Sequence, residues 1–428
     1  MEKFPELGHA ALPFFSLEDG YINLNSGTAG ATPRRVEDAT RDLADKVAAK
    51  PDRFLWFDYR PMVEEVRGLI AKLIGAHPSD CAFVSNVSHG INIVLRNFDW
   101  ENGDVLVMTN CTFNTIRAAA RYVSDTAPHP KLSEFTLSIP EKRKALFERF
   151  RKFLQSLKAQ RRQSADETPK GKIVAVLDSI SATPSVYMPW KDMVQICREE
   201  SVWSVIDAAH SLGQEVDLNL TEAAPDFWVC SKWMYAKHGC AVLYVPECNH
   251  HIIRSAFPTG ITFGPLPPGH EGDPQTKFSW TGTIEFTIPL SIKPALEFRE
   301  LLGGEKRIND YCHTLALAGG KHLAETLNTR MMFAPNSDEA EMFTANMVNV
   351  EIPLAGSIAP TPAVTLKFQD KLLNEHNVYA SQFHYDGRWW TRVSAQVYNE
   401  IGDFEKLGKA LLIVCAEISE EIAERTKM

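Results

Sequence analysis

The sequence predicts an α/β protein with a mostly parallel sheet in a large domain, followed by a smaller C-terminal α+β domain. Short β-branched runs alternate with helical patterns as far as residue 245, which is typical of a parallel sheet covered by helices on both faces. From about residue 302 the pattern changes to a long helix, two strand-like stretches and a final helix. The 428 residues are enough for two domains. We place the large domain at 23–301 and the small domain at 1–22 and 302–428.

The elements follow from local periodicity and composition. The expected strands are short apolar runs at 80–84, 105–108, 173–177, 203–206 and 240–245. The expected helices have apolar residues at helical spacing and cover 34–50, 61–75, 91–97, 305–327 and a stretch from residue 404. Residues 85–90 read as a turn. Residues 155–172 are polar and 256–282 carry many Pro and Gly, so both are expected to be irregular.

The composition excludes several classes of protein. With 45 basic and 54 acidic residues the net charge is −9, which argues against a nucleic-acid partner. No apolar run approaches the roughly 18–20 residues that span a bilayer, and the first residues lack the pattern of a signal peptide. The eight cysteines are scattered, and His250-His251 lack suitably spaced partners, so no metal site is expected. We expect a cytoplasmic protein.

An acid and a lysine stand out in two neighbouring apolar runs. Asp207 ends the first run, and Lys232 lies in the second, 25 residues further on. A lysine can form a Schiff base with pyridoxal 5'-phosphate (PLP), and a carboxylate at a strand end can hold the proton on its ring nitrogen. The pair therefore predicts a PLP enzyme. Taken singly, the better interpretation of Asp207 is a helix N-cap, and Lys232 could be a lysine that extends to solvent.

Three further features suit an active site with this cofactor and an amino-acid substrate. The turn Ser85–Gly90 lies between a strand and a helix, where backbone N–H groups and the Ser88 hydroxyl can bind a phosphate; a simple capping turn is the alternative. Phe113 follows the next strand and is either a ring-stacking aromatic or a core residue. Arg392, among aromatic and β-branched residues, suits a substrate carboxylate. Arg388 is the competing candidate, and a surface ion pair is the alternative for Arg392.

As a set, these segments resemble the class V aminotransferase family of PLP enzymes, which has fold type I. The resemblance runs from Tyr21–Gly27 to Arg392–Asn399, and it is strongest to the branch of isopenicillin N epimerase-like proteins and ergothioneine-pathway carbon–sulfur lyases. Each matching residue has an implied role: substrate binding by Asn25 and Arg392, phosphate binding by Val87 and Ser88, ring stacking by Phe113, catalysis and cofactor binding by Asp207, His210 and Lys232.

The resemblance also implies a homodimer. Trp280–Thr283 is similar to the loop that, in this family, crosses the dimer interface, so Thr281 and Thr283 are expected to reach the phosphate in the partner subunit. The two active sites would then be shared between subunits.

Several positions depart from the family pattern. Ser231 stands where a histidine usually precedes the lysine, and the segment Phe227–Lys232 is about two residues shorter than usual, by comparison with that pattern. Ser179 occupies a place where the branch often has histidine, and Ala182 one where it often has a polar residue. Cys230 does not suit a persulfide-forming cysteine, which argues against a cysteine desulfurase.

The expected function is formation of a Cα carbanion from an L-amino acid. We expect this carbanion to attack an aldehyde or imine in a Mannich-type cyclisation, because the chain resembles fungal alkaloid-pathway members of the branch, those of loline biosynthesis among them. The alternatives are a carbon–sulfur lyase acting by β-elimination, and an epimerase or aminotransferase. A non-catalytic PLP-binding module is the alternative of another class.

Overall fold

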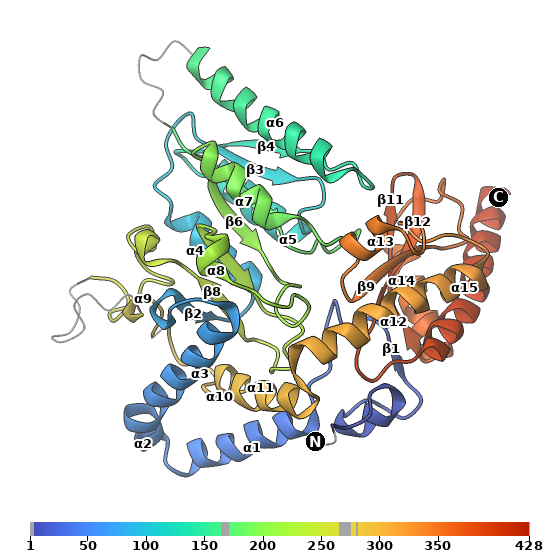
Figure 1. The fold of residues 1–428 in the computed structure, drawn as a ribbon, viewed down its shortest axis with the longest axis horizontal. Coiled ribbons are helices and arrows are strands. Elements are labelled where there is room, and N and C mark those ends of the chain that lie inside the picture. Colours follow the sequence, from blue (N-terminus) through green and yellow to red (C-terminus); the bar gives the residue numbers. More distant parts are fainter. Residues whose placement is uncertain (1–3, 164–170, 265–274, 280, 428) are drawn as a thin grey trace.

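A seven-stranded sheet forms the centre of the larger part of the molecule (Figure 1). The structure is a computed structural model, and it describes residues 4–163, 171–264, 275–279 and 281–427. The strand order is β2-β8-β7-β6-β5-β3-β4. The strands are β2 (Cys81–Val84), β3 (Val105–Thr109), β4 (Lys131–Phe135), β5 (Ile173–Asp178), β6 (Trp203–Asp207), β7 (Phe227–Cys230) and β8 (Ala241–Tyr244). Among the described strands of this sheet, β8 alone runs antiparallel to its neighbours, β2 and β7. The other pairs are parallel, which confirms the mostly parallel α/β fold.

Helices alternate with these strands and continue after them. Those of the first half are α1 (Arg34–Ala49), α2 (Pro51–Arg53), α3 (Tyr59–Ile74), α4 (Val87–Asn97), α5 (Asn114–Asp125), α6 (Arg143–Gln163), α7 (Trp190–Glu199) and α8 (Leu220–Ala223). Those of the second half are α9 (Thr276–Ser279), α10 (Thr287–Leu290), α11 (Ile292–Leu301), α12 (Gly304–Leu327), α13 (Asp338–Phe343), α14 (Pro362–Asp370) and α15 (Ile401–Lys427). Among the described residues, no helix combines the length and the apolar character needed to cross a membrane.

A second, three-stranded antiparallel sheet lies in the C-terminal part. Its strands are β9 (Met347–Glu351), β11 (Ser381–Tyr385) and β12 (Arg388–Ser394), in the order β11-β12-β9. Helices α12 and α15 pack together, and with the sheet they enclose a separate apolar core. The chain start joins this part, because β1 (Ile22–Asn23) pairs in parallel with β10 (Val378–Tyr379). The exact domain boundaries stay a prediction.

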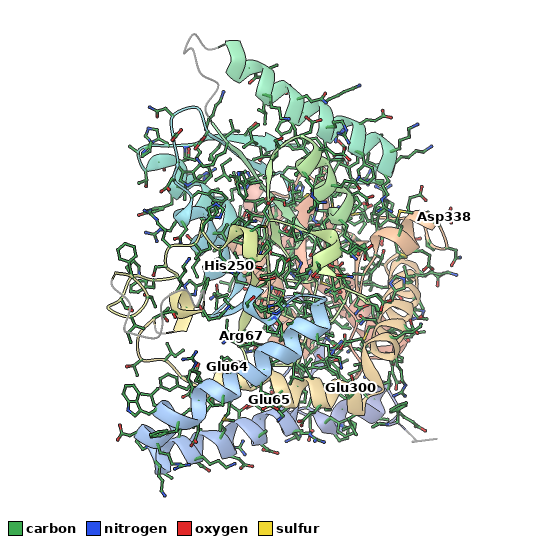
Figure 2. The ribbon with its side chains drawn as sticks, turned by 60° about the vertical axis from the view of Figure 1, so that its left-hand side comes forward. Glu64, Glu65, Arg67, His250, Glu300 and Asp338 are labelled. Carbon is green, nitrogen blue, oxygen red and sulfur yellow. The ribbon has the colours of Figure 1, made fainter. Side chains whose placement is uncertain are left out.

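Helices α1, α3, α10 and α11 form a group below the sheet in Figure 1, and charged side chains line its surface (Figure 2). Glu65 of α3 accepts from Lys293 of α11 at 2.5 Å, and Glu64 accepts from Arg60 at 3.0 Å. Such exposed ion pairs stabilise a fold only slightly. Of the two pairs, Lys293–Glu65 links α11 to α3, whereas Arg60–Glu64 lies within α3.

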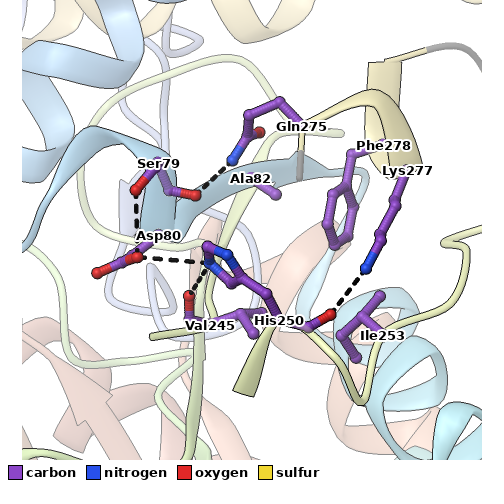
Figure 3. A pocket seen from close by; sticks show the side chains of 9 residues that line it. All are labelled: Ser79, Asp80, Ala82, Val245, His250, Ile253, Gln275, Lys277 and Phe278. Atoms are coloured by element: carbon purple, nitrogen blue, oxygen red, sulfur yellow. Dashed lines mark hydrogen bonds and ion pairs between the residues drawn. The ribbon is translucent and has the colours of Figure 1, made fainter. Parts of the chain in front are cut away.

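The segment that leads toward Thr281 is fixed to the edge of the sheet (Figure 3). Gln275 donates to the carbonyl of Ser79 at 2.7 Å, and Lys277 donates to the carbonyl of His250 at 2.8 Å. The ring of His250 contacts the carbonyl of Val245 and, at 3.4 Å, the carboxylate of Asp80. His250 is therefore a structural residue, and no group of metal-ligating side chains occurs in the described part of the chain.

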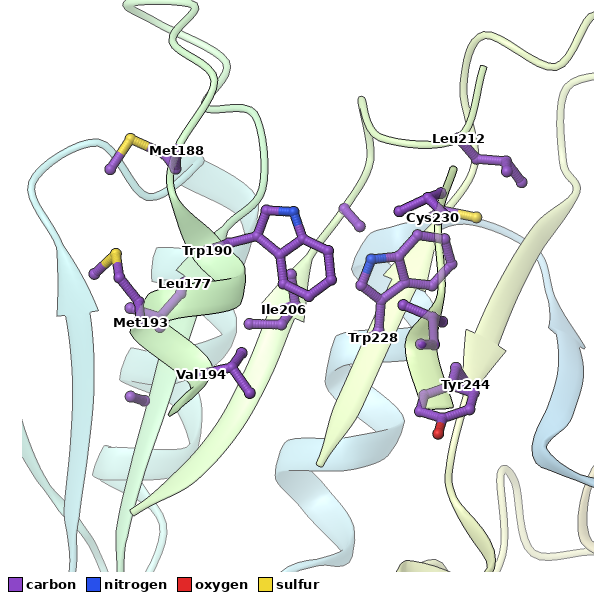
Figure 4. Packing of buried hydrophobic residues seen from close by; sticks show 14 of the residues in the cluster. Leu177, Met188, Trp190, Met193, Val194, Ile206, Leu212, Trp228, Cys230 and Tyr244 are labelled. Carbon is purple, nitrogen blue, oxygen red and sulfur yellow. The ribbon is translucent and has the colours of Figure 1, made fainter. Parts of the chain in front are cut away.

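The central sheet is buried on both faces. In β5, Ala175 and Leu177 belong to the core under α3, α6 and α7, while Val174 and Val176 belong to the core under α4 and α5. A strand buried on both faces has no polar alternation, which is why its sequence is one continuous apolar run. Figure 4 shows Trp190 of α7 and Trp228 of β7 in the first of these cores.

Some expected elements differ in the structure. Helix α6 continues to Gln163, into a stretch expected to be a loop, because Leu154 and Leu157 still face the core and Lys, Arg and Gln are good helix formers. Helix α4 begins at Val87, so part of the expected turn 85–90 is helical. The short helix α9 lies in the stretch 256–282. Strand β4 was not expected.

Candidate active site

The predicted site residues gather where strands end. Strands β2, β3, β5, β6 and β7 run in one direction, so their carboxyl ends share one edge of the sheet. This edge is the usual ligand site of such folds. The predicted residues from these strand ends are Val87 and Ser88 after β2, Phe113 after β3, Asp207 in β6 and Lys232 after β7.

Lys232 is half-buried at this edge. Its Nζ donates to the carbonyl of Gly27 at 2.9 Å, and its backbone N–H donates to the carbonyl of Ala209 at 3.1 Å. Burial, and then the charge of Arg392, lower the pKa of Lys232 to about 8, against the opposing effect of Asp207. A sizeable neutral fraction near neutral pH is what a nucleophilic or basic amine needs.

Asp207 ends β6 and is 5% exposed. One carboxylate oxygen accepts from the backbone N–H of Ala209 at 3.1 Å. Burial raises the pKa of Asp207 to about 6, against the opposing effects of that N–H and of Lys232. A buried carboxylate at this edge suits a protonated ring nitrogen.

Asp178 is a second buried carboxylate that the sequence reasoning missed. It ends β5 and is the register partner of Asp207, so both side chains project to the same face of the sheet. Burial, and then the charge of Asp207, raise the pKa of Asp178 well above its usual range, while Arg117 opposes this. The signal was available, because Asp178, like Asp207, directly follows an apolar run.

His210 lies beside Lys232 as a neutral imidazole. It is 2% exposed, and its Nδ1 accepts from the indole N–H of Trp233 at 3.3 Å. Burial lowers the pKa of His210 well below its usual range, and the charges of Lys232 and Arg392 lower it further. With Nδ1 as an acceptor, the proton of the neutral ring is on Nε2, which can donate to an oxygen such as the phenolic oxygen of PLP.

Arg392 is buried, and no carboxylate of the described residues pairs with it. Its guanidinium donates to Ala182 O at 3.0 Å, Asn25 Oδ1 at 3.1 Å and Thr28 Oγ1 at 2.8 Å. Its Nε has no acceptor in the described part of the structure, and burial lowers the pKa of Arg392 to about 10. Three neutral acceptors leave its charge available for an anion. The rival, Arg388, is half-exposed and pairs with Glu351 at 2.9 Å.

Gly27 leaves space between the lysine and the arginine. A Cβ there would lie 2.6 Å from the sulfur of Met347 and 3.1 Å from Cζ of Arg392. The backbone N–H of Gly27 donates to Ser394 Oγ at 3.1 Å. The chain near Asn25 can therefore pass directly beside Arg392, a close approach that the sequence reasoning did not foresee.

The start of α4 is the segment that the sequence predicts to bind phosphate. Asn86 caps the helix by accepting from the N–H of His89 at 2.7 Å, and Val87 and Ser88 form the first turn, whose N–H groups have no intrahelical acceptors. Gly90 lets α4 lie directly on β7, because a Cβ there would be 2.5 Å from Cγ1 of Val229. Phe113 caps α5 and is 45% exposed.

The dimer-loop residues remain apart from this cluster. Thr283 is exposed and Thr281 partly exposed, in the loop before α10, and no described hydrogen bond joins either to the other site residues. Trp280, the first residue of this predicted loop, lies outside the described residues.

The residues that depart from the family pattern lie close to the site. Ser179 is fully buried and its hydroxyl has no partner among the described residues, Ala182 supplies the carbonyl bound by Arg392, and Ser231 is half-buried beside Lys232. Cys230 is also fully buried, and burial raises the pKa of its thiol well above the usual range. A buried, protonated thiol is a poor nucleophile.

Fold and site together define a PLP-dependent enzyme of fold type I. The residues fit the cofactor, since they offer an amine of lowered pKa, a buried carboxylate, a helix start for the phosphate and an uncompensated guanidinium. The chain belongs to the class V aminotransferase family, and its cofactor is pyridoxal 5'-phosphate.

Comparisons with curated proteins support this membership, although no protein-family model matches the chain. L-cysteine desulfhydrase-like protein lolT1 of Epichloe uncinata is 32% identical over 447 residues, which cover 96% of each chain. Hercynylcysteine sulfoxide lyase of Schizosaccharomyces pombe is 28% identical over 415 residues, covering 96% of this chain and 98% of its own. Isopenicillin N epimerase of Streptomyces clavuligerus is 24% identical over 265 residues, covering 61% of this chain and 62% of its own.

Solved structures show the same fold. A mutant of C-DES with glycine covalently linked to its PLP cofactor superposes with a TM-score of 0.74 at 16% identity, covering 92% of this chain and 96% of its own. A cysteine desulfurase from Thermococcus onnurineus gives a TM-score of 0.72 at 18% identity, covering 97% of this chain and 99% of its own. These likenesses confirm the predicted fold type I.

Proposed function

We propose that this PLP enzyme is a carbon–sulfur lyase, which cleaves the Cβ–S bond of an L-cysteine-type substrate by β-elimination. The observation that carries the proposal is the buried guanidinium of Arg392, bound to three neutral acceptors, in the same site as the Lys232 amine. The first suits an amino-acid carboxylate and the second the removal of a proton from Cα. That the substrate carries sulfur is inferred from the names of the relatives, desulfhydrase-like protein and sulfoxide lyase.

Each residue has a distinct task in this proposal. Arg392, with Asn25 and Thr28 holding its guanidinium, binds the carboxylate and orients the Cα–H bond toward Lys232. Lys232 takes the Cα proton, the Cβ–S bond breaks with its electron pair leaving on sulfur, and Lys232 returns its proton to that sulfur. When bound, PLP supplies the electron sink for the carbanion. Asp207 would keep the ring nitrogen of bound PLP protonated, and His210 would donate to its phenolic oxygen.

The cofactor phosphate has two proposed sources of ligands. Val87 and Ser88 would bind it through the first turn of α4, and Phe113 would stack on the ring from the start of α5. Thr281 and Thr283 act in the partner subunit, as the family resemblance implies. The exposed Thr283 and its neighbour Ile284, which is 51% exposed, are compatible with such an interface.

The Mannich-type cyclisation stays a prediction, as do epimerisation and transamination. It needs an aldehyde or imine electrophile, whereas β-elimination needs only the substrate, and the relatives' names favour carbon–sulfur chemistry. The non-catalytic module is not retained, because the relatives named above are enzymes.

The test is a product assay on the purified, PLP-loaded chain. L-cysteine, an S-alkyl-L-cysteine and its sulfoxide are supplied in turn, and pyruvate, ammonia and the sulfur product are measured. β-Elimination releases pyruvate and ammonia in equal amounts with at least one of them, and none with the Lys232→Ala variant. Consumption or racemisation of the amino acid without pyruvate would contradict the lyase and favour a cyclase or an epimerase.

A further inference from the structure

The backbone just after Lys232 has an unusual conformation. Trp233 has a φ of 72° and Tyr235 a φ of 70°, in the left-handed region that bulky side chains rarely adopt. Such conformations persist only where the surroundings hold them, and they are frequent at functional sites. Whatever holds this segment also determines where the amine of Lys232 points.

The side chain of Arg299, in α11, contacts both residues. It is 2% exposed, and its Nη1 donates to the carbonyl of Trp233 at 2.9 Å. The carbon of its guanidinium lies 5.2 Å from the ring centroid of Tyr235. A single guanidinium thus binds one strained residue by its backbone and the other by its ring.

The same guanidinium reaches the loop that carries His210. Its Nη2 donates to the carbonyl of Gly213 at 3.2 Å. Gly213 has a φ of +94°, and a Cβ there would lie 2.5 Å from the carbonyl oxygen of Trp233. The loops after β6 and β7 therefore touch at this point, and Arg299 joins their two carbonyls.

Glu305, in the first turn of α12, compensates the buried charge. Its Oε2 accepts from Nη2 of Arg299 at 2.6 Å, and its other oxygen contacts Nε. A role confined to the corner between α11 and α12 would need this ion pair alone. The two further bonds, to Trp233 and Gly213, point toward the active site instead.

We propose that Arg299 is a positioning residue for Lys232. By binding the carbonyl of Trp233 it fixes the peptide between Trp233 and Met234, directly after Lys232 in the chain. Through the carbonyl of Gly213 it joins this segment to the loop that carries His210. The proposal rests on Lys232 being the cofactor-binding amine. Lysine cannot replace this arginine, because it lacks the planar set of donors that serves three acceptors at once.

The test compares Arg299→Lys with Arg307→Lys in the full chain freed of PLP. Arg307 is a matched control: it lies near the same corner, donates to Leu302 O at 2.5 Å and has its guanidinium carbon 5.5 Å from the centroid of the Phe4 ring, without reaching the Lys232 loop. PLP affinity, the rate at which the visible band of lysine-linked PLP appears, and thermal unfolding are measured. Misplacing a reacting group by about 1 Å can cost about 100-fold in rate, so Arg299→Lys should slow linkage at least about tenfold and Arg307→Lys by less than about twofold.

Gly213→Ala tests the same contact without changing Arg299. Its Cβ displaces the carbonyl of Trp233, so linkage should slow as in Arg299→Lys, and amide hydrogen exchange in residues 231–236 should quicken in both variants. If both fold and link PLP within about twofold of the wild-type rate, Arg299 is a structural ion-pair residue only and the proposal is wrong. If Arg299→Lys does not fold, Gly213→Ala decides by the same criterion.

The variant Lys232→Ala tests separately whether Lys232 is the amine that binds PLP, on which the Arg299 proposal rests. Loss of the visible band in that variant leaves Lys232 as the linked amine, so the Arg299 result then stands or falls by itself. A band that survives Lys232→Ala would refute the lysine assignment and the Arg299 proposal together.

Discussion

The protonation state of Lys232 is controlled by the site. Its pKa is lowered to about 8, chiefly by burial. The neutral amine attacks the PLP aldehyde, so the rate of linkage to the chain freed of PLP should rise with pH up to about 8 and then level off. Stopped-flow absorbance over a pH series measures this. A rate still rising toward pH 10, as for an ordinary lysine, would contradict the buried amine.

Arg392 and Arg388 offer a matched pair, because they lie four residues apart on β12 and differ in their surroundings. Arg392 is buried among neutral acceptors, whereas Arg388 pairs with Glu351 on the surface. A hydrogen bond to a charged group contributes about 1.5–3 kcal/mol, so Arg392→Met should lower kcat/KM about 10- to 100-fold. Arg388→Met should change it by less than about twofold, since exposed ion pairs contribute little. The reverse order of effects would make Arg388 the carboxylate ligand.

At the residue scale, only site residues marked by a local sequence pattern could be predicted. Asp207 and Lys232 were predictable because each carries charge in an apolar run that ends at the same sheet edge. Thr28 and Arg299 were not, because their roles depend on contacts with Arg392 and Trp233, far away in the chain. Asp178 had the same local pattern as Asp207, but no lysine follows at a matching distance.

The start of α4 is the element proposed to bind the phosphate of PLP. Gly90→Ala should push α4 away from β7, since the new Cβ would lie 2.5 Å from Val229 Cγ1. We expect a loss of about 1–3 kcal/mol of stability, with weaker PLP binding, as for other overpacked cores. Gly68→Ala on α3 is the control, because a Cβ there has nothing within 4 Å and alanine favours a helix. Thermal unfolding of both variants checks this, and equal shifts would contradict the close packing.

At the element scale, buried strands were easier to predict than edge strands. Strands β5 and β6 are apolar throughout because helices cover both faces. Strand β4 was missed because it lies at the sheet edge and exposes Lys131 and Glu134, so its sequence lacks the apolar run. The end of α6 was misassigned because its polar residues are as compatible with an exposed helix as with a loop.

The whole molecule is proposed to act as a homodimer. Trp56 and Phe57, in the π-helix Phe54–Asp58, are 73% and 70% exposed, an uncommon state for such large apolar side chains. Replacing both by glutamate should shift the mass in solution from dimer to monomer and lower PLP affinity, if the partner completes the phosphate site. Leu366→Glu is the control, since Leu366 is 64% exposed on α14 in the C-terminal part. A wild-type chain that is monomeric while fully active would contradict the shared site.

The central claim is that one lysine at the carboxyl edge of the sheet holds PLP. The most direct measurement is mass spectrometry of the PLP-loaded chain after borohydride reduction and digestion, which makes the linkage permanent and locates it. The account predicts the added mass of reduced PLP on the peptide containing Lys232, and its absence from Lys237 nearby, which is paired with Glu37. Label on another lysine, or on none, would contradict the site and the lyase chemistry proposed for it.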